Sequence, residues 1–306
     1  MRVPTSPTPA GPRPDAMIDE LRDLRLLSLV ENGTGLIGYR FHGPLFDAFE
    51  ALDGALVALF REEYRPTAHS CTTLLEREAL ESIGFFDKLP SIPLHAVPHE
   101  IAADQSPGPS AWVLSPSTCY HTFGHLSGID ERWDLRCFTA RGVCHRFEPS
   151  AESTRLASFT MREFVLIGDA DLVVSRGESM FEQAVAFLGR LHDDVSVKKA
   201  SDVFYGERSE VTRRVQLARG VKREVLIPWA GDELAVGSRN LHRDLFTTVF
   251  GIGPNGGPAM HSACVAFGIE RLLLALLART EGHDPERLCA LISTALAESS
   301  SAVHAT

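Results

Sequence analysis

The chain has 306 residues, of which 44% are hydrophobic and 23% are charged, a composition sufficient for one large domain, with or without a small appendage. Its net charge of −10 and isoelectric point near 5.6 argue against a protein that holds a long polyanion such as tRNA or DNA over a broad surface, although a local basic patch is compatible with them. The sequence has no apolar run long enough to cross a bilayer, and prolines interrupt its N-terminal region where a signal peptide needs an apolar core. We therefore expect a cytoplasmic protein with no membrane partner.

The cysteines are spread through the chain without a CxxC pair, which argues against a disulfide scaffold or a zinc finger. A metal site assembled from distant cysteines is still allowed. The six are Cys71, Cys119, Cys137, Cys144, Cys264 and Cys289.

Residues 1–16 are rich in proline, serine, threonine and glycine and predict a disordered arm. Foldable sequence begins at Met17. The run IDELRDLRLLSLVENGTG predicts a helix stopped at Asn32 and Gly33, and LFDAFEALDGALVALFREE repeats apolar residues at helical spacing. We interpret both helices as packing elements.

Two further elements precede the middle of the chain. TTLLEREALESIGFFDKLPSIP predicts a helix that ends at Gly84, followed by an extended run punctuated by prolines. AWVLSPSTCYHTF then predicts a buried strand that breaks at Pro116 and delivers Cys119.

Residues 141–168 are the stretch around which we expect the rest of the chain to be organised. Two apolar-rich runs, GVCHRFE and FTMREFVLI, flank a polar loop. The loop contains Pro149, Ser150, Glu152, Ser153 and Thr154. This pattern predicts a long antiparallel hairpin.

The arms of this hairpin carry charged residues at even spacing. Arg146 and Glu148 lie two apart, while Arg155, Phe159 and Glu163 recur every fourth residue, so each set shares one face of its strand. Two arginines, two carboxylates and an aromatic ring on one face are costly to bury unless they bind a charged, flat ligand. The face therefore predicts a nucleotide site. The alternatives are a cross-strand ion pair between Arg146 and Glu148 and core packing for Phe159.

Beyond the hairpin, the sequence predicts an amphipathic helix from about Glu178 and then a basic segment. Six cations crowd into this segment of an otherwise acidic chain: Arg208, Arg213, Arg214, Arg219, Lys222 and Arg223. One interpretation is a solvated helix face, which is the usual role of a charge run. The other is a docking surface for an acidic partner.

The last third of the chain contains a strand-like run, DELAVGSRNLHRDLFTTVFGI, and a strand followed by a buried helix, CVAFGIERLLLALLA. Arg271 lies near the start of that helix, where the macrodipole opposes a positive charge. An anion such as phosphate would justify its position.

The runs CHRFE, RLASFTMRE and FGIERL resemble motifs 2 and 3 of class II aminoacyl-tRNA synthetases of the seryl type, in the right order and with the expected spacer. RLASFTMRE follows the seryl-type pattern R-x-x-x-F-x-x-x-E, and ELAVGSRN resembles the segment that helps to hold ATP, magnesium and substrate. The resemblance covers roughly residues 70–280 and implies that residues 17–306 form a synthetase-like catalytic domain. The implied fold is α+β, an antiparallel sheet of about six strands flanked by helices, in a homodimer whose interface includes the region around residues 75–93.

Residues 1–70 are too short, and lack the sustained heptads, for the coiled-coil arm with which seryl-tRNA synthetases grip tRNA, so we expect no tRNA partner. The chain is more similar to the bacterial amino acid:[carrier protein] ligases, which resemble the zinc-dependent archaeal seryl-tRNA synthetases. That resemblance implies ATP-dependent activation of a small amino acid, glycine or alanine, and its transfer to the phosphopantetheine thiol of a small acidic carrier protein. Two rival functions stay open: a compact tRNA-charging enzyme and a non-catalytic, synthetase-like regulatory protein.

The same resemblance implies roles for the charged residues in ATP binding. Arg146 would bind the α-phosphate and the amino acid carboxylate, Glu148 would bind the adenine amino group, and Phe159 would stack on the adenine ring. Arg155 and Arg271 would bind the outer phosphates, and Arg146 and Arg271 would be the catalytic arginines. Arginine suits these roles because its planar fork pairs with phosphate or carboxylate through two hydrogen bonds.

Metal and substrate ligands are implied in the same way. Zinc would be held by Cys119, Glu163 and Cys264, Glu233 would help to place magnesium, and Asp202 would face the substrate amino group. A zinc ion with three protein ligands and an open position can accept a free amino group, and thiolate ligands favour zinc over magnesium. The alternatives are two small buried hydrophobic cysteines and a turn-forming aspartate. The other four cysteines are expected in the core.

In the family, the carrier protein docks on a segment inserted between motifs 2 and 3, which corresponds here to about residues 178–226. An acidic carrier would meet Arg213, Arg214 and Arg219 and would gain association rate more than affinity. Reversing all three arginines to glutamate is expected to abolish carrier loading and to leave adenylate formation intact.

Overall fold

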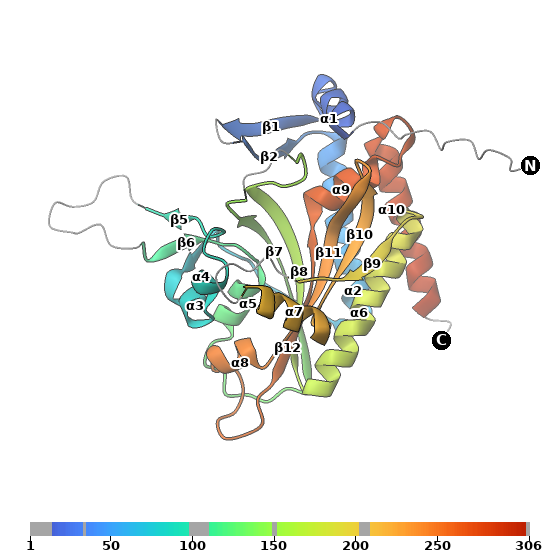
Figure 1. The fold of residues 1–306 in the computed structure, drawn as a ribbon. Helices are drawn as coiled ribbons and strands as arrows, with labels where there is room; N and C mark the ends of the chain where they lie inside the picture. The colour runs from blue at the N-terminus through green and yellow to red at the C-terminus, as the bar shows by residue number, and fades with distance from the viewer. Residues whose placement is uncertain (1–13, 33–34, 98–109, 149–151, 202–208, 304–306) are drawn as a thin grey trace, which may run out of the picture.

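The computed structural model describes residues 14–32, 35–97, 110–148, 152–201 and 209–303 (Figure 1). Its helices are α1 (Pro14–Asp23), α2 (Pro44–Tyr64), α3 (Arg77–Ser82), α4 (Phe85–Lys88), α5 (Cys119–His125), α6 (Ala170–Leu191), α7 (Ser209–Arg219), α8 (Leu245–Val249), α9 (Ile269–Leu277) and α10 (Pro285–Val303), with the 3-10 turn η1 (Glu281–His283). Its strands are β1 (Leu27–Asn32), β2 (Gly35–Phe41), β3 (Thr67–Ala68), β4 (Leu74–Glu76), β5 (His95–Ala96), β6 (Trp112–Leu114), β7 (Leu135–His145), β8 (Ser158–Gly168), β9 (Ser196–Lys199), β10 (Lys222–Trp229), β11 (Asp232–Arg243) and β12 (His261–Gly268).

The centre of the molecule is a sheet with the strand order β3-β7-β8-β12-β11-β10-β9. All neighbouring strands are antiparallel except the two-residue β3, which pairs in parallel with β7 at one edge. The α+β prediction is confirmed, and the expected count of about six strands becomes seven within the described residues because of this short edge strand.

The predicted hairpin forms the second and third strands of this sheet, between the short edge strand β3 and the middle strand β12. β7 and β8 are antiparallel in a continuous register from Leu135↔Gly168 to His145↔Ser158. β8 is buried from Met161 to Gly168, because both faces of the sheet are covered and its side chains alternate between the two layers. Phe159 and Glu163 lie on β8, but Arg146, Glu148 and Arg155 lie in the connection between the two strands, so the predicted shared strand faces are wrong for these three charged residues.

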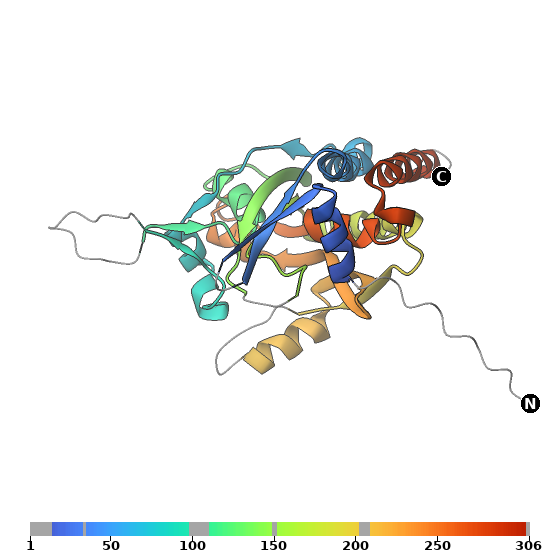
Figure 2. The same ribbon diagram turned by 90° about the horizontal axis from the view of Figure 1, so that it is seen from above.

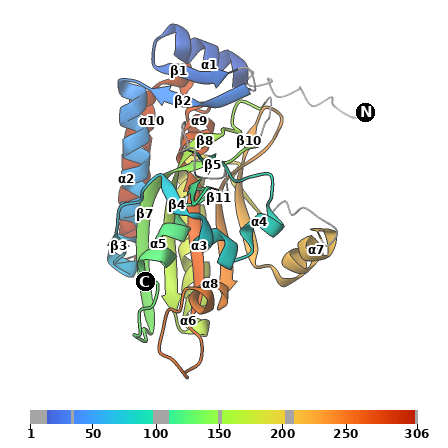
Figure 3. The same ribbon diagram turned by 90° about the vertical axis from the view of Figure 1, so that its left-hand side faces the viewer.

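Helices α2, α6, α9 and α10 cover one face of the sheet, and α2 and α10 lie side by side in the outer part of this layer (Figures 1 and 2). The main apolar core lies between these helices and the sheet and includes Phe60, Phe164, Phe187 and Phe267. On the opposite face, α3, α4, α5, α8 and the small sheet β4-β6-β5 enclose a second core around Phe123 and Val165. α7 stands apart from the central sheet on this second side (Figure 3).

The prediction of one helix up to Asn32 is wrong. α1 ends at Asp23, and Arg25 adopts a left-handed backbone conformation with φ of 57°. The chain then continues as β1, which pairs with β2. Apolar spacing in LRLLSLV fits both a helix and a strand, and here pairing with β2 decides between them.

Other helix predictions need smaller changes. α2 and α9 are confirmed, and α3 ends two residues before Gly84, which has a positive φ of 67°. α6 begins at Ala170 rather than near Glu178, because the Asp169 carboxylate accepts the backbone N–H of Asp171 at 3.0 Å and caps the helix. The predicted disordered arm lies mostly outside the described residues, and α1 already begins at Pro14. Among the helices that the structure describes, none combines the length and apolar character needed to span a bilayer.

Candidate active site

A cavity of about 820 Å³ opens on the face of the sheet that carries the smaller core. Side chains of β8, β10, β11 and β12 line it from the sheet, and α4, α5, α7, α8 and the start of α9 line it from around. Among the described residues it is the larger of the two best-defined cavities. A concave site at the centre of the fold, with several convergent charged groups, is the expected form of a binding or catalytic site.

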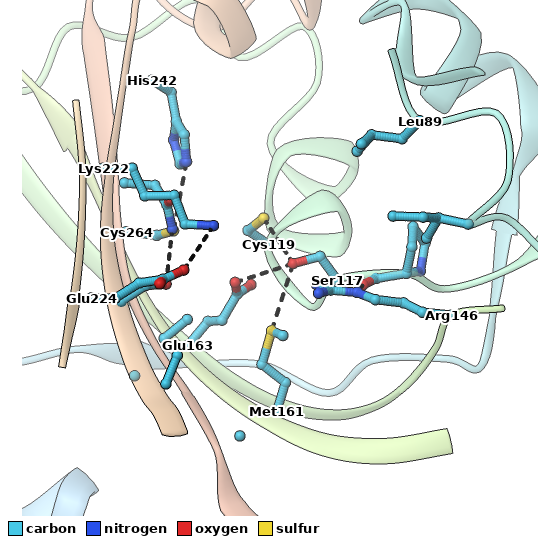
Figure 4. A pocket seen from close by; sticks show the side chains of 18 of the residues that line it. Leu89, Ser117, Cys119, Arg146, Met161, Glu163, Lys222, Glu224, His242 and Cys264 are labelled. Atoms are coloured by element: carbon cyan, nitrogen blue, oxygen red, sulfur yellow. Dashed lines mark hydrogen bonds and ion pairs between the residues drawn. The ribbon is translucent and has the colours of Figure 1, made fainter. Parts of the chain in front are cut away.

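Two cysteines and a glutamate meet at the bottom of this cavity (Figure 4). Glu163 on β8 lies opposite Ala266 of β12, and Cys264 lies two residues along the same strand, so both side chains point to the same face. Cys119 is the first residue of α5, which follows the break at Pro116. All three are buried, with exposed fractions of 5% for Cys119 and 2% each for Glu163 and Cys264.

Hydrogen bonds from neighbouring side chains hold these three groups. The Ser117 hydroxyl donates to Glu163 Oε1 at 3.2 Å and lies 3.6 Å from Cys119 Sγ. Asn240 Nδ2 donates to Cys264 Sγ at 3.6 Å, and His242 Nε2 lies 3.5 Å from the same sulfur. Glu163 Oε2 is buried without a hydrogen-bond partner among the described residues, which is costly unless something else satisfies it.

The pKa values of the two sulfurs are shifted in opposite directions. A hydrogen bond from the Cys119 thiol lowers the pKa of Cys264, and its contacts with His242 and Asn240 lower it further. The same interaction raises the pKa of Cys119. Burial raises the pKa of Glu163 to about 8. A nearby cation would favour the ionised form of all three.

As the side chains stand, no three His, Cys, Asp or Glu residues in the described part of the chain are grouped closely enough to hold a metal ion. The residues nevertheless fit zinc in two respects. Two sulfurs and one carboxylate are ligands that zinc prefers, and one carboxylate oxygen is buried and unsatisfied.

The other end of the cavity is cationic and carries the aromatic ring. Arg146 follows the end of β7, its Nε donates to Pro116 O at 2.9 Å, and its guanidinium carbon lies 5.3 Å from the centre of the Phe159 ring. Glu148 forms an ion pair with Arg155 at 2.8 Å. The alternative cross-strand pair between Arg146 and Glu148 is therefore not the one that forms, and Phe159 lines the cavity.

Arg271 completes a group of three arginines. It lies at the start of α9, where its Nε donates to Thr154 O at 2.8 Å. Burial lowers the pKa of Arg271, and the charges of Arg155 and Arg146 lower it further. Three guanidinium groups that repel one another in one cavity form a strong site for an anion with several charges.

The remaining predicted site residues do not all reach the cavity. Glu233 is the second residue of β11, forms an ion pair with Lys198 of β9 and is not among the residues that line the cavity. Its predicted role beside magnesium stays a prediction. Asp202 lies outside the described residues. Arg213 and Arg214 are exposed on α7, whereas Arg219 at the end of α7 is among the residues that line the cavity.

The four cysteines predicted for the core divide into two pairs. Cys137 and Cys144 are buried. Cys71 and Cys289 are half-buried. Cys289 packs against the main core, whereas the prediction is wrong for Cys71. Cys71 lies near the edge of the sheet, where its Cβ would be 3.3 Å from a Cβ added at Gly142.

Several residues that line the cavity had no individual role in the prediction, although Ser238 and Asn240 lie in the run ELAVGSRN and Lys222 lies in the basic segment. Ser238, Asn240 and His242 occupy alternate positions of β11 and all line the cavity. Their period of two was a readable signal, because polar residues two apart on a strand share one face. Lys222 and Glu224 on β10 line the cavity in the same way and form an ion pair at 3.2 Å.

Solved structures of seryl-tRNA synthetases have the same fold. The Methanopyrus kandleri enzyme, in complex with tRNASec of A. aeolicus, superposes with a TM-score of 0.73 at 17% identity over 95% of this chain and 63% of that chain. The Pyrococcus horikoshii enzyme, complexed with ATP, superposes with a TM-score of 0.68 at 14% identity over 90% of this chain and 62% of that chain. The chain thus spans less than two thirds of these synthetases and has the fold of their catalytic domain.

Two curated relatives indicate a more specific family among proteins with this synthetase fold. Amino acid–[acyl-carrier-protein] ligase 2 of Bradyrhizobium diazoefficiens is 33% identical over 233 residues, which are 69% of each chain. Ligase 1 of the same organism is 32% identical over 302 residues, which are 92% of this chain and 90% of the relative. No protein-family model matches the chain. The chain belongs to the amino acid–[acyl-carrier-protein] ligases, a family of enzymes.

Proposed function

We propose that this enzyme activates glycine or alanine with ATP and transfers the aminoacyl group to the phosphopantetheine thiol of a carrier protein. In the first step a carboxylate oxygen of the amino acid attacks the α-phosphorus of ATP, and pyrophosphate leaves. In the second step the thiol sulfur attacks the carbonyl carbon of the adenylate, and AMP leaves. The observation that carries the proposal is a single cavity with two chemically different ends. One end has arginines and an aromatic ring and suits a nucleotide, and the other has buried sulfurs and a buried carboxylate and suits an amino acid.

The arginine end would bind ATP. Arg146 already lies over the Phe159 ring, so an adenine that stacks on Phe159 would lie close to this arginine. From there Arg146 would bind the α-phosphate and the attacking carboxylate. Glu148 would accept a hydrogen bond from the adenine amino group. Arg155 and Arg271 would bind the outer phosphates. These residues position two anions and neutralise the charge that develops as pyrophosphate leaves.

The sulfur end would bind the amino acid. Cys119, Glu163 and Cys264 would hold a zinc ion, which when bound would supply an open coordination position for the free amino group of the substrate. Ser117, Asn240 and His242 would orient these ligands through the hydrogen bonds described above. We propose magnesium as the counterion of the ATP phosphates, with Glu233 as the residue named for it by the resemblance, and Asp202 as the residue that faces the amino group.

The carrier protein would dock on α7. Arg213 and Arg214 are exposed there beside Val211 and Val215, whose exposed fractions are 62% and 42%. The exposure of both arginine side chains would let them meet an acidic partner. Val215 also lines the cavity. A carrier on α7 would therefore have its phosphopantetheine thiol next to the cavity.

Pyrophosphate exchange tests the activation step. The purified enzyme is assayed with each proteinogenic amino acid and with β-alanine, and exchange with glycine or alanine is the expected result. Absence of exchange with all of these amino acids would refute the proposed ligase activity of this chain and favour a non-catalytic role.

Transfer is tested with radiolabelled glycine or alanine. A phosphopantetheinylated carrier protein should become labelled, and the same carrier without the prosthetic group serves as the control. Labelling of tRNA in place of the carrier would favour the tRNA-charging alternative. The predicted homodimer and cytoplasmic location stay predictions that sedimentation and fractionation would check.

A further inference from the structure

The hairpin of β1 and β2 lies over the ends of β7 and β8, where the chain passes from Arg146 to Ser158 (Figure 1). Its sequence reads as a packing element, and no predicted site residue lies in it. One of its residues nevertheless contacts the loop that carries Arg155, and another lies against the first residue of β8.

Gly38 on β2 makes the closest backbone approach. A Cβ at this position would be 3.0 Å from the carbonyl oxygen of Ser158, the first residue of β8. Gly38 is buried. Only a residue without a side chain lets the two backbones come this close without displacement.

The next residue, Tyr39, contacts the loop directly. Its hydroxyl donates a hydrogen bond to the carbonyl oxygen of Ser153. The ring is supported from behind, because Tyr39 stacks on Phe41 with 6.1 Å between ring centres and Phe41 contacts Phe49 of α2 at 5.6 Å. The hydroxyl is thus fixed to the core through a chain of aromatic rings.

The contact falls next to the nucleotide-binding residues. The carbonyl of Ser153 is held by Tyr39, and the carbonyl of the next residue, Thr154, is held by Arg271. Arg155 follows immediately, and its guanidinium pairs with Glu148 in the cavity. Two successive carbonyls are therefore fixed from outside the loop, one by each of two separate elements, just before Arg155.

We propose that Tyr39 is a positioning residue for ATP, which acts by fixing the backbone from which Arg155 reaches the outer phosphates. This inference rests on the proposed function. Its effect falls on the nucleotide end of the cavity and not on the amino acid end, because none of the residues around Cys119, Glu163 and Cys264 contacts the β1–β2 hairpin in the described interactions.

The test is Tyr39→Phe, which keeps the ring and removes the hydroxyl. Tyr64→Phe is the matched control, since Tyr64 also donates to a backbone carbonyl, that of Arg176 at 3.3 Å, but joins α2 to α6 away from the cavity. We expect Tyr39→Phe to raise KM for ATP in pyrophosphate exchange about fivefold, the effect of one neutral hydrogen bond. KM for the amino acid should stay at the wild-type value, and Tyr64→Phe should change neither KM.

A second variant and a direct binding measurement complete the test. Gly38→Ala should push β2 away from Ser158 and weaken binding of a non-hydrolysable ATP analogue, measured by calorimetry, in the same direction as Tyr39→Phe. Unchanged affinity for the analogue in both variants, or equal increases of both KM values in Tyr39→Phe, would overturn the inference. Absence of exchange in the wild-type enzyme would instead refute the proposed function, while the analogue would still report on the hairpin.

Discussion

Replacing Glu270 by glutamine should change how the free energy of unfolding depends on pH. The pairing of β8 with β12 ends at Met161↔Gly268, because β12 turns into α9 at that point. The next amide of β8, that of Thr160, needs another acceptor. Glu270 supplies it, with both carboxylate oxygens 2.8 Å from Thr160 N. Glu270 therefore extends the ladder at the residue that follows Phe159.

The magnitude follows from the burial of this carboxyl group, which is 8% exposed. Burial raises the pKa of Glu270 from 4.5 to about 7. A folded-state pKa above the unfolded value stabilises the fold fully below pH 4.5, and this contribution is lost as pH rises through 7. The shift from 4.5 to about 7 is about 2.5 pH units, so at about 1.4 kcal/mol per unit the whole loss is about 3.5 kcal/mol.

Urea unfolding at a series of pH values from 5 to 8 measures the effect. Between pH 5 and pH 8 the difference in unfolding free energy between wild type and Glu270→Gln should shift by about 2.5 kcal/mol in favour of the variant, because glutamine does not titrate and the rest of the loss falls below pH 5. Glu182→Gln, at an exposed position of α6, is the control and should run parallel to wild type. Parallel curves for Glu270→Gln and wild type would refute the reasoning, whatever their vertical separation.

Three further predictions concern zinc binding, docking of the carrier protein, and the ion pair between α2 and the face of the sheet that α2 covers. Cys264→Ser should lower bound zinc, measured by metal analysis of the purified protein, from about one ion per chain to a small fraction of that; full zinc content would contradict the assigned ligands. Charge reversal of Arg213 and Arg214 together should lower carrier loading about tenfold and leave pyrophosphate exchange unchanged, and loss of both activities would count against docking on α7. Asp53→Ala should cost about 3 kcal/mol in a urea unfolding curve, because it leaves the buried Arg162 without its carboxylate; a cost under about 1 kcal/mol would show that the pair is not important for stability.

Part of the site could be predicted because β8 and the connection before it carry several of its residues in one short stretch of sequence. The even spacing of Arg155, Phe159 and Glu163 indicated a shared face, and all three line the cavity. A hairpin is built from contacts between residues close in sequence, so its pattern can be read without the rest of the fold. The α+β class followed from the resemblance of its motifs and is confirmed.

What could not be predicted depends on contacts between distant segments. Glu233 follows the tight turn after β10 and pairs with Lys198 of the edge strand, which a linear motif does not reveal. The Tyr39 contact joins residues 114 positions apart. The break between α1 and β1 falls at Arg25, where neither glycine nor proline marks the left-handed backbone.

Alternation along β8 also controls how the sheet can assemble. Arg162 faces α2, where Asp53 holds its guanidinium through hydrogen bonds of 2.7 and 2.6 Å, while the adjacent Glu163 faces the cavity. A slip of one residue in strand pairing would exchange the two faces. It would bury Glu163 against Asp53, two carboxylates without a cation between them, and would send an arginine to the sulfur end of the cavity. Arg162 and Glu163, which face opposite sides of the sheet, therefore also destabilise misregistered sheets during folding.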